Sequence, residues 1–136
     1  MKSRSTRRAA KQRGAYLVEY SLVILVFLFV LLGIMEFGRI VTAYNILSGA
    51  TREGTRYAIV HGSRSGVAAT ASDVQDQVRR WCIGLDASAV TVTTAWPSGN
   101  SPGAPVSVTT SYGITPLVGF ISPFTVGSRS QMVISQ

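Results

Sequence analysis

The chain has 136 residues, which is enough for one modest globular domain with a small hydrophobic core. Its formal net charge of +7 would indicate a nucleic-acid-binding surface if the charges were spread over a domain. However, six of the 13 basic residues lie in the first 13 positions, and the charges of the other seven are nearly balanced by the six acidic residues of the chain. The six are Lys2, Arg4, Arg7, Arg8, Lys11 and Arg13. The charge therefore belongs to a short N-terminal head, and we expect no nucleic-acid partner.

The head is followed by an apolar stretch long enough to cross a membrane. Residues 22–35 carry no polar side chain, and the 21 residues 15–35 are interrupted only by Glu19, Tyr20 and Ser21. At about 1.5 Å per residue, a helix of this length crosses a hydrocarbon core of about 30 Å. We predict a transmembrane helix over residues 15–36. The basic head before it places the N-terminus in the cytoplasm and the rest of the chain outside.

A secretory signal peptide also combines a basic start with an apolar run. Its removal requires small residues shortly after the apolar region, whereas EFGRIVTAYN follows here. The nearest small-residue site, residues 48–50, lies too far downstream. Ordinary signal-peptide cleavage is therefore disfavoured, while an uncleaved anchor remains open.

The helical pattern continues beyond the span. Apolar residues recur at steps of three and four over residues 37–60, with polar residues between them, which predicts an amphipathic continuation of the same helix. The apolar positions are Phe37, Ile40, Val41, Tyr44, Leu47, Ala50, Tyr57 and Ala58. Four glycines interrupt this long helix: Gly33, Gly38, Gly49 and Gly54. They are compatible with tolerated flexibility, and equally with close helix packing or local melting.

Residues 61–136 predict a small external α+β domain. Residues 61–66 form a loop by composition, and Ser72 with Gln75 resembles a capping box, which predicts a helix over residues 73–83. Alternating apolar residues at 90–94 and 106–110, separated by a segment rich in Pro and Gly, predict an antiparallel hairpin. Residues 115–124 form a connection, and a last strand is predicted near residues 131–135. Three strands covered by the two helices would complete the domain.

The junction between head and span, residues 13–20, reads RGAYLVEY and carries the chemistry. A carboxylate in the first turns of a spanning helix costs a few kcal/mol, so Glu19 requires a partner or a use. In the intact chain, Arg13 lies nearby, and Glu19 could also lie at the membrane interface. A cut between Gly14 and Ala15 would create a charged amine about 6 Å along the axis from Glu19. Glu19 could then neutralise that amine, on its own chain or on a neighbour.

A basic leader ending in Gly, followed by an apolar helix whose fifth residue is Glu, resembles the processing signature of type IV pilin-like proteins. More narrowly, RGAYLVEYSLVI, the later EFGR and TREGTRYA resemble the TadE family, the minor pseudopilins of the tight-adherence (Flp) pilus system. The resemblance covers residues 13–60, and the C-terminal part is similar only in general layout. The fold it implies is a type IV pilin-like lollipop of the α+β class.

The resemblance also implies residue roles. Residues 1–14 would be a leader that a prepilin peptidase removes between Gly14 and Ala15, and Glu19 would guide the docking of one subunit beside another. The family's second motif, whose role the sequence does not explain, matches Arg52, Glu53, Gly54 and Arg56.

Partners and location follow from the same resemblance. The expected partners are the prepilin peptidase, other pilin-like subunits (the major Flp pilin and a companion pseudopilin), the inner-membrane assembly platform and the lipid bilayer. The expected location is the bacterial cytoplasmic (inner) membrane, crossed once, with incorporation in an extracellular pilus left open.

An enzymatic function is not expected, because the reagents are missing. His61 is the only histidine and Cys82 the only cysteine, neither has metal-ligand neighbours in sequence, and the chain contains no SxxK motif. We therefore predict no metal and no cofactor. Cys82 is interpreted as a buried apolar residue rather than a redox thiol. Trp81 and Trp96 are interpreted as packing residues rather than binding-surface aromatics.

Overall fold

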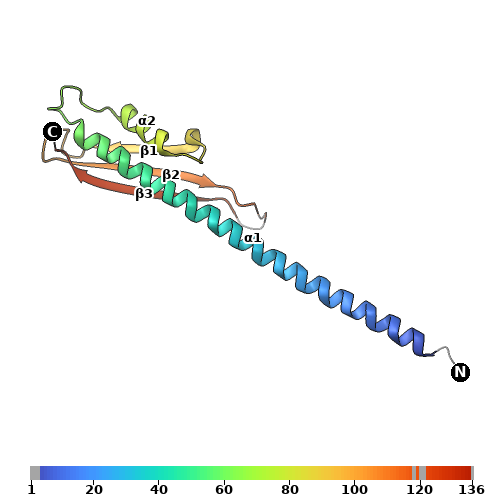
Figure 1. Cartoon of the computed structure of the whole chain (residues 1–136). Coiled ribbons are helices and arrows are strands. Elements are labelled where there is room, and N and C mark those ends of the chain that lie inside the picture. Colours follow the sequence, from blue (N-terminus) through green and yellow to red (C-terminus); the bar gives the residue numbers. More distant parts are fainter. Residues whose placement is uncertain (1–3, 118, 120–121, 136) are drawn as a thin grey trace. The chain divides into compact units, whose positions relative to one another are not determined.

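The computed structural model describes residues 4–117, 119 and 122–135, with side chains from Ala15 onward. The elements along the chain are α1 (Arg4–Val60), α2 (Ala71–Trp81), the short 3-10 helix η1 (Ala87–Ala89), β1 (Val90–Ala95), β2 (Pro105–Ile114) and β3 (Phe124–Val133) (Figure 1). This confirms the predicted α+β class, with a long N-terminal helix, a short helix and a three-stranded antiparallel sheet. In the basic head, residues 4–14 have a helical backbone, and Lys2 lies outside the described residues.

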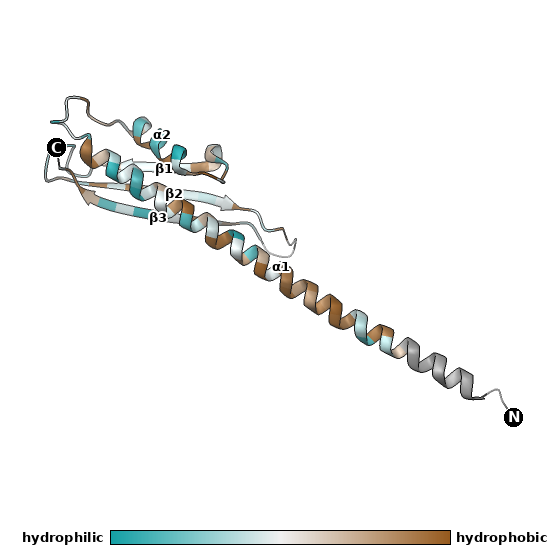
Figure 2. Ribbon diagram, in the orientation of Figure 1, coloured by the Kyte–Doolittle hydropathy of each residue, from teal (hydrophilic) through white to brown (hydrophobic). Residues whose placement is uncertain are grey.

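The chain forms two compact units, one ending at Gly38 and the other beginning at Arg39. The first unit contains the apolar part of α1. Among the described residues, α1 is the one helix that is long and apolar enough to cross a membrane, with a window of mean hydropathy 2.7 between Ala15 and Val60. Figure 2 shows a run of hydrophobic residues along this part of α1 and mixed colours further along the helix. The predicted end of the long helix at about Val60 agrees with α1, whereas α1 begins at Arg4 and not at Ala15.

The second unit is built on an antiparallel sheet in the order β1-β2-β3. Register pairs Val92 with Thr110 and Thr110 with Ser128, so these residues lie on one face of the sheet. The opposite face is lined largely by exposed Thr and other polar residues. The hairpin predicted from the alternating valines is confirmed, and the wide loop between β1 and β2 contains Gly99 and Gly103, which have positive φ values of 81° and 86°.

The core of this unit lies between the sheet and the two helices, and it is small. Leu47, Ala50 and Ala58 of α1 share one buried cluster with residues of α2 and of the sheet. The other members are Ala69, Val74, Val78, Cys82, Val90, Ala104, Val106, Val108 and Ile134. Trp96 packs against this cluster, as predicted.

The predicted boundaries of the short helix were wrong. α2 begins at Ala71 and ends at Trp81, and its N-cap is Thr70 with Asp73, not Ser72 with Gln75. Thr70 is the N-cap because the short side chain of Asp73 reaches back and accepts from the Thr70 N–H at 2.9 Å. The Thr70 side chain accepts from the Asp73 N–H in turn, which completes the reciprocal pair of a capping box. The shift leaves Ile83 outside the helix. Trp81 was expected to pack in the core or at its rim, and at 51% exposed it does not lie in the core.

The last strand was predicted near residues 131–135, but β3 begins at Phe124 and ends at Val133. Ser128 and Ser130 occupy inward positions after Phe124 and Val126, so the apolar alternation is interrupted in the middle of the strand. The length of β3 is set by pairing along the whole of β2, from Phe124 opposite Ile114 to Val133 opposite Pro105. Its start is therefore determined by a partner strand and not by local composition.

The predicted apolar face of residues 37–60 is only partly correct. Leu47, Ala50 and Ala58 are buried, but Val41 and Tyr44 are 39% and 49% exposed. The helix instead buries a face dominated by small residues, which allow the sheet and α2 to approach closely. These buried residues are Ala43, Leu47, Ala50, Thr51, Gly54, Thr55 and Ala58.

Candidate functional site

The first candidate region is the uncovered part of α1, residues 15–35. Every residue in it is exposed, and its large apolar side chains range from 40% exposed at Ile24 to 69% exposed at Tyr16 and Val18. Soluble monomers rarely expose contiguous apolar surface on this scale. This surface must therefore be covered by lipid, by other apolar helices, or first by one and then by the other.

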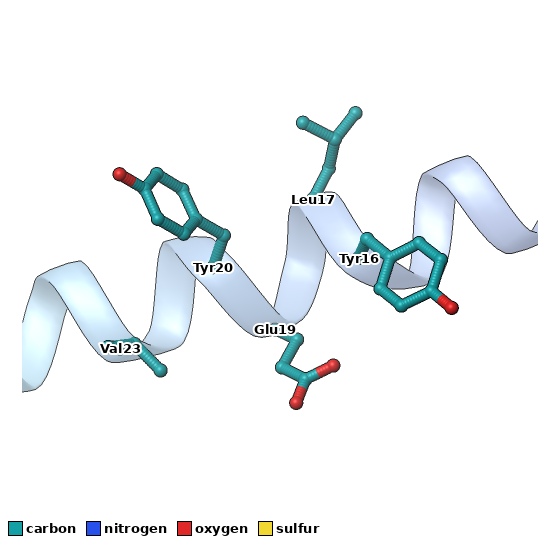
Figure 3. Close-up of a pocket in the computed structure, with 5 residues that line it drawn as sticks. All are labelled: Tyr16, Leu17, Glu19, Tyr20 and Val23. Carbon is teal, nitrogen blue, oxygen red and sulfur yellow. The ribbon is translucent and has the colours of Figure 1, made fainter.

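Glu19 is the single charged residue in this stretch. Figure 3 shows its carboxylate on the side of the helix opposite Leu17. Tyr16 and Val23 line the helix surface beside Glu19. The 3.6-residue period of the helix explains the arrangement, because residues three and four positions apart from Glu19 lie on its face.

The Glu19 side chain is exposed, and none of the side chains that the structure describes forms a hydrogen bond with it. Its neighbour Ser21 differs, because its hydroxyl donates to the Leu17 carbonyl at 2.7 Å and is satisfied within the helix. A carboxylate in lipid without a partner is costly, and pairing with a cation between helices lowers that cost. The geometry therefore leaves Glu19 available to a positive group from outside the described residues.

Gly14 and Ala15, the residues of the predicted cleavage, lie in the helical backbone of α1, and Ala15 is exposed. Ala15 precedes Glu19 by four residues, or about 6 Å of helix axis. An amine at Ala15 and the Glu19 carboxylate would thus lie one turn apart on the same element.

The second candidate region is the segment TREGTRYA, residues 51–58, in the second unit. Its residues divide by side: Gly54 and Thr55 are buried together with Thr51 and Ala58, whereas Arg52 and Arg56 are exposed. The buried positions follow the spacing i, i+3, i+4, i+7, which places them on one face of α1. The structure thus splits the sequence motif into a buried set of small residues and an exposed set of charged ones.

Gly54 lies where α1 and α2 pack closely against each other. A Cβ atom added at Gly54 would overlap the Val78 side chain of α2 and would also contact Val74. In contrast, a Cβ at Gly33, Gly38 or Gly49 would meet nothing within 4 Å among the described atoms. Of the two interpretations left open by the sequence, close helix packing therefore applies to Gly54.

Glu53 and Arg56 form the exposed ion pair expected from their spacing. The Arg56 Nη2 lies 2.8 Å from Glu53 Oε1, and Nε donates to both carboxylate oxygens at 3.0 and 3.2 Å. The hydrogen bond from Arg56 lowers the pKa of the Glu53 carboxyl, and the same bond raises the pKa of Arg56. Such an exposed ion pair contributes little to the stability of a helix, so the two charged groups remain accessible to a binding partner.

Sequence reasoning missed the contribution of two threonines in the same segment. The Thr51 hydroxyl lies 2.6 Å from the Thr110 hydroxyl of β2 and 2.6 Å from the Leu47 carbonyl. The Thr55 hydroxyl donates to the Thr51 carbonyl at 2.8 Å. Both side chains are fully buried, so these bonds satisfy them inside the core. The spacing of small residues was the available signal, but the larger apolar residues obscured it.

His61 and Cys82, the two residues considered for metal or redox chemistry, both make packing contacts within the second unit. The His61 ring stacks on Tyr57 with centroids 4.1 Å apart, and its Nδ1 lies 3.0 Å from the Tyr57 carbonyl at the end of α1. Cys82 is 2% exposed and is the C-cap residue that follows α2, and burial raises the pKa of its thiol. The interpretation of Cys82 as a buried apolar residue is confirmed.

Residues 14–56 match the model of a family described as TadE-like protein, which is associated with the Tad/Flp pilus. The match includes Gly14, Ala15, Glu19 and the segment from Arg52 to Arg56. It ends before α2 and the sheet. No match was found among curated proteins or among solved structures.

Proposed function

We propose that this chain, whose residues 14–56 match the TadE-like family, acts as a minor pilin-like (pseudopilin) subunit in the assembly of a Tad/Flp pilus. The family match supports a Tad-pilus-related role and interaction with other pilus components, and the apolar helix supports a single-pass membrane anchor. The proposal adds the mechanism by which it does so. Its mature form begins at Ala15 and packs through α1 with other pilin-like subunits.

The observation that carries the proposal is the uncovered apolar helix with one carboxylate in its second turn, inside the segment that matches the family. A helix that only anchored a domain would have no need for Glu19 within the apolar stretch. A helix that leaves lipid to join a bundle needs both a large apolar surface and a way to align with its neighbour. The Glu19 carboxylate supplies the alignment by pairing with the amine at Ala15 of the adjacent subunit.

Removal of the head fits the same mechanism. The six cationic side chains of the leader resist passage through the bilayer, so the intact chain is held in the membrane. A prepilin peptidase cutting between Gly14 and Ala15 on the cytoplasmic side removes all six and creates the new amine. Cleavage thus releases the subunit and supplies the charge that Glu19 needs.

The proposed partners follow from these steps. They are the prepilin peptidase, the major Flp pilin and a companion pseudopilin, the inner-membrane assembly platform, and the bilayer itself. We expect no catalytic activity of the chain's own, and its role is structural. The second unit, with its polar outer sheet face, would lie outside the cytoplasm.

The competing function is a single-pass membrane protein with an uncleaved anchor and an external binding domain. It is favoured by the fact that the second unit has its own core and could bind a partner unaided. The two functions differ in the state of the N-terminus.

N-terminal sequencing of the membrane-extracted protein separates them. We expect a start at Ala15 in cells that express the peptidase, and an intact head in cells that lack it. Gly14→Leu should abolish the cut, whereas the same enlargement at Ala10→Leu should leave it. A start at Met1 or Lys2 in peptidase-expressing cells would overturn the pseudopilin proposal in favour of the uncleaved anchor.

A further inference from the structure

A hollow of about 190 Å³ lies within the second unit, where the end of α1 meets α2 (Figure 1). Its lining combines the ion pair of the family's second motif with two aromatic rings, an amide and one apolar side chain. The lining residues are Glu53, Arg56, Tyr57, Val60, His61 and Gln77. Small-molecule sites usually measure about 300–1,000 Å³. The hollow is therefore better suited to one side chain of a partner than to a metabolite.

The hollow is rich in hydrogen-bond acceptors. The Arg56 Nε and Nη2 donate to the Glu53 carboxylate and hold it in place, and the Glu53 side chain remains 20% exposed. The His61 Nδ1 donates to the Tyr57 carbonyl at 3.0 Å, which leaves Nε2 of the neutral ring as an acceptor. The Gln77 side chain adds an amide oxygen. A ligand that only donates hydrogen bonds therefore matches this lining.

The rings and charges around the hollow favour a cation. The Tyr57 and His61 rings stack with their centroids 4.1 Å apart, and the face of an aromatic ring attracts positive charge. The Asp73 carboxylate, in the first turn of α2, interacts electrostatically with His61. Two carboxylates, those of Glu53 and Asp73, thus stand against the single guanidinium of Arg56. A planar cation can lie on a ring face and donate to a carboxylate at the same time.

We propose that this hollow binds the guanidinium group of an arginine side chain from a partner protein. A guanidinium is planar and positively charged and has five N–H donors and no acceptor, so it matches the rings, the charges and the acceptors together. Glu53 accepts from the bound arginine, and Arg56 is a positioning residue that fixes the Glu53 carboxylate. The proposal gives the exposed half of the second motif a binding role, while Gly54 and Thr55 pack inside the unit.

The test uses the full chain in micelles of a zwitterionic detergent at pH 8. His61 is the only histidine, so its ring gives one set of NMR signals that reports on the hollow. The probes are N-acetyl-arginine amide and N-acetyl-citrulline amide, which has a similar shape but no charge. We expect the arginine probe to shift the His61 signals saturably in the millimolar range, and the citrulline probe to bind about fivefold more weakly.

Two variants that each remove one negative charge locate the binding. Glu53→Gln should weaken binding of the arginine probe about fivefold. Asp86→Asn is the matched control, because Asp86 lies in the second unit but does not line the hollow, and it should leave the binding unchanged. Both variants should fold, since the Glu53 ion pair is exposed and Asn caps a helix as well as Asp does, and circular dichroism checks this.

Three results would overturn the proposal. They are unmoved His61 signals, equal binding of the arginine and citrulline probes, and equal loss of binding in Glu53→Gln and Asp86→Asn. The last result would show general attraction of a cation to the second unit and no site at the hollow.

This inference goes beyond the proposed function and can fail separately from it. The measurement requires neither cleavage of the head nor an assembled pilus. A chain that keeps its head in peptidase-expressing cells but binds the arginine probe would reject the pseudopilin function and retain the arginine site. Cleavage at Gly14 without probe binding would do the opposite.

Discussion

At the scale of single residues, Gly49 and Gly54 illustrate how one helix can contain two glycines with opposite consequences. A Cβ at Gly54 overlaps Val78, whereas a Cβ at Gly49 meets no described atom within 4 Å. We expect Gly54→Ala to lower the free energy of unfolding by about 1–3 kcal/mol, because α2 must move away. Gly49→Ala should raise it by up to about 1 kcal/mol, because alanine favours the helix. Urea unfolding of the detergent-solubilised chain, followed by tryptophan fluorescence, measures both changes.

The contact with Val78 can be separated from general intolerance at position 54. In a chain that already carries Val78→Ala, the missing methyl groups leave room for the new Cβ, so Gly54→Ala should cost much less than it does in the native background. The same cost in both backgrounds would contradict the packing explanation. Equal effects of alanine at positions 49 and 54 would do so as well.

The residues that could be predicted from the sequence are those whose chemistry is visible against their local background. Glu19 stands out because it interrupts an apolar run, and Gly14 because it separates a basic head from that run. The role of Gly54 could not be predicted, because the atoms that require it belong to Val74 and Val78, some twenty residues later. Thr51 was missed for the same reason, since its partner Thr110 lies on a strand.

At the scale of elements, the N-terminus of α2 depends on Thr70. Its hydroxyl accepts from the Asp73 N–H at 3.3 Å, and the Asp73 carboxylate accepts from the Thr70 N–H at 2.9 Å. Thr70→Ala should lower the free energy of unfolding by about 1 kcal/mol, whereas Ser72→Ala, at the cap predicted from the sequence, should change it by less than about 0.5 kcal/mol. If Ser72→Ala lowered the free energy of urea unfolding more than Thr70→Ala does, the N-cap would be Ser72 and not Thr70.

The same cap has a pH dependence whose sign is fixed by Asp73. Hydrogen bonds from the Thr70 side chain and backbone lower the pKa of the Asp73 carboxyl in the folded chain. Its stabilisation is therefore fully present above the unfolded pKa, at about pH 4, and is lost as the pH falls through the lower folded value. Asp73→Asn should destabilise the chain at pH 7, and the difference from the native chain should shrink towards pH 3. A difference that did not depend on pH would show that the charge of Asp73 contributes nothing.

Elements with a strong internal signal were predicted well, and those defined by partners were not. The end of α1 at Val60 and the hairpin of β1 and β2 were visible as a 3.6-residue pattern, a glycine-rich loop and alternating valines. β3 was predicted too short because Ser128 and Ser130 occupy inward positions that the neighbouring strand and helix enclose only in part. Positions that are only partly enclosed tolerate polar residues, and these polar residues interrupt the apolar and polar alternation by which a strand is predicted from sequence.

At the scale of the whole molecule, α1 serves two environments with one continuous helix. Residues 15–35 present large apolar side chains all round, whereas the part after Arg39 buries small residues against the sheet and α2. The first pattern suits lipid and the core of a helix bundle alike, because neither requires a fixed face. Specific alignment in such a bundle must therefore come from a feature other than apolar shape, and Glu19 is the one charged group in the stretch.

This argument predicts a separation between processing and assembly. Glu19→Gln keeps the shape of the side chain but cannot neutralise an amine, so it should be cleaved normally at Gly14 and should assemble poorly, as should Glu19→Ala. Ser21→Ala is the matched control, because the Ser21 hydroxyl is already bonded to the Leu17 carbonyl at 2.7 Å and should contribute nothing to docking. The measurements are the N-terminal sequence of each variant and the amount of sheared pilus per cell. Normal pilus output from Glu19→Gln would show that shape rather than charge aligns the helices, whereas loss of cleavage would move the role of Glu19 to recognition by the peptidase.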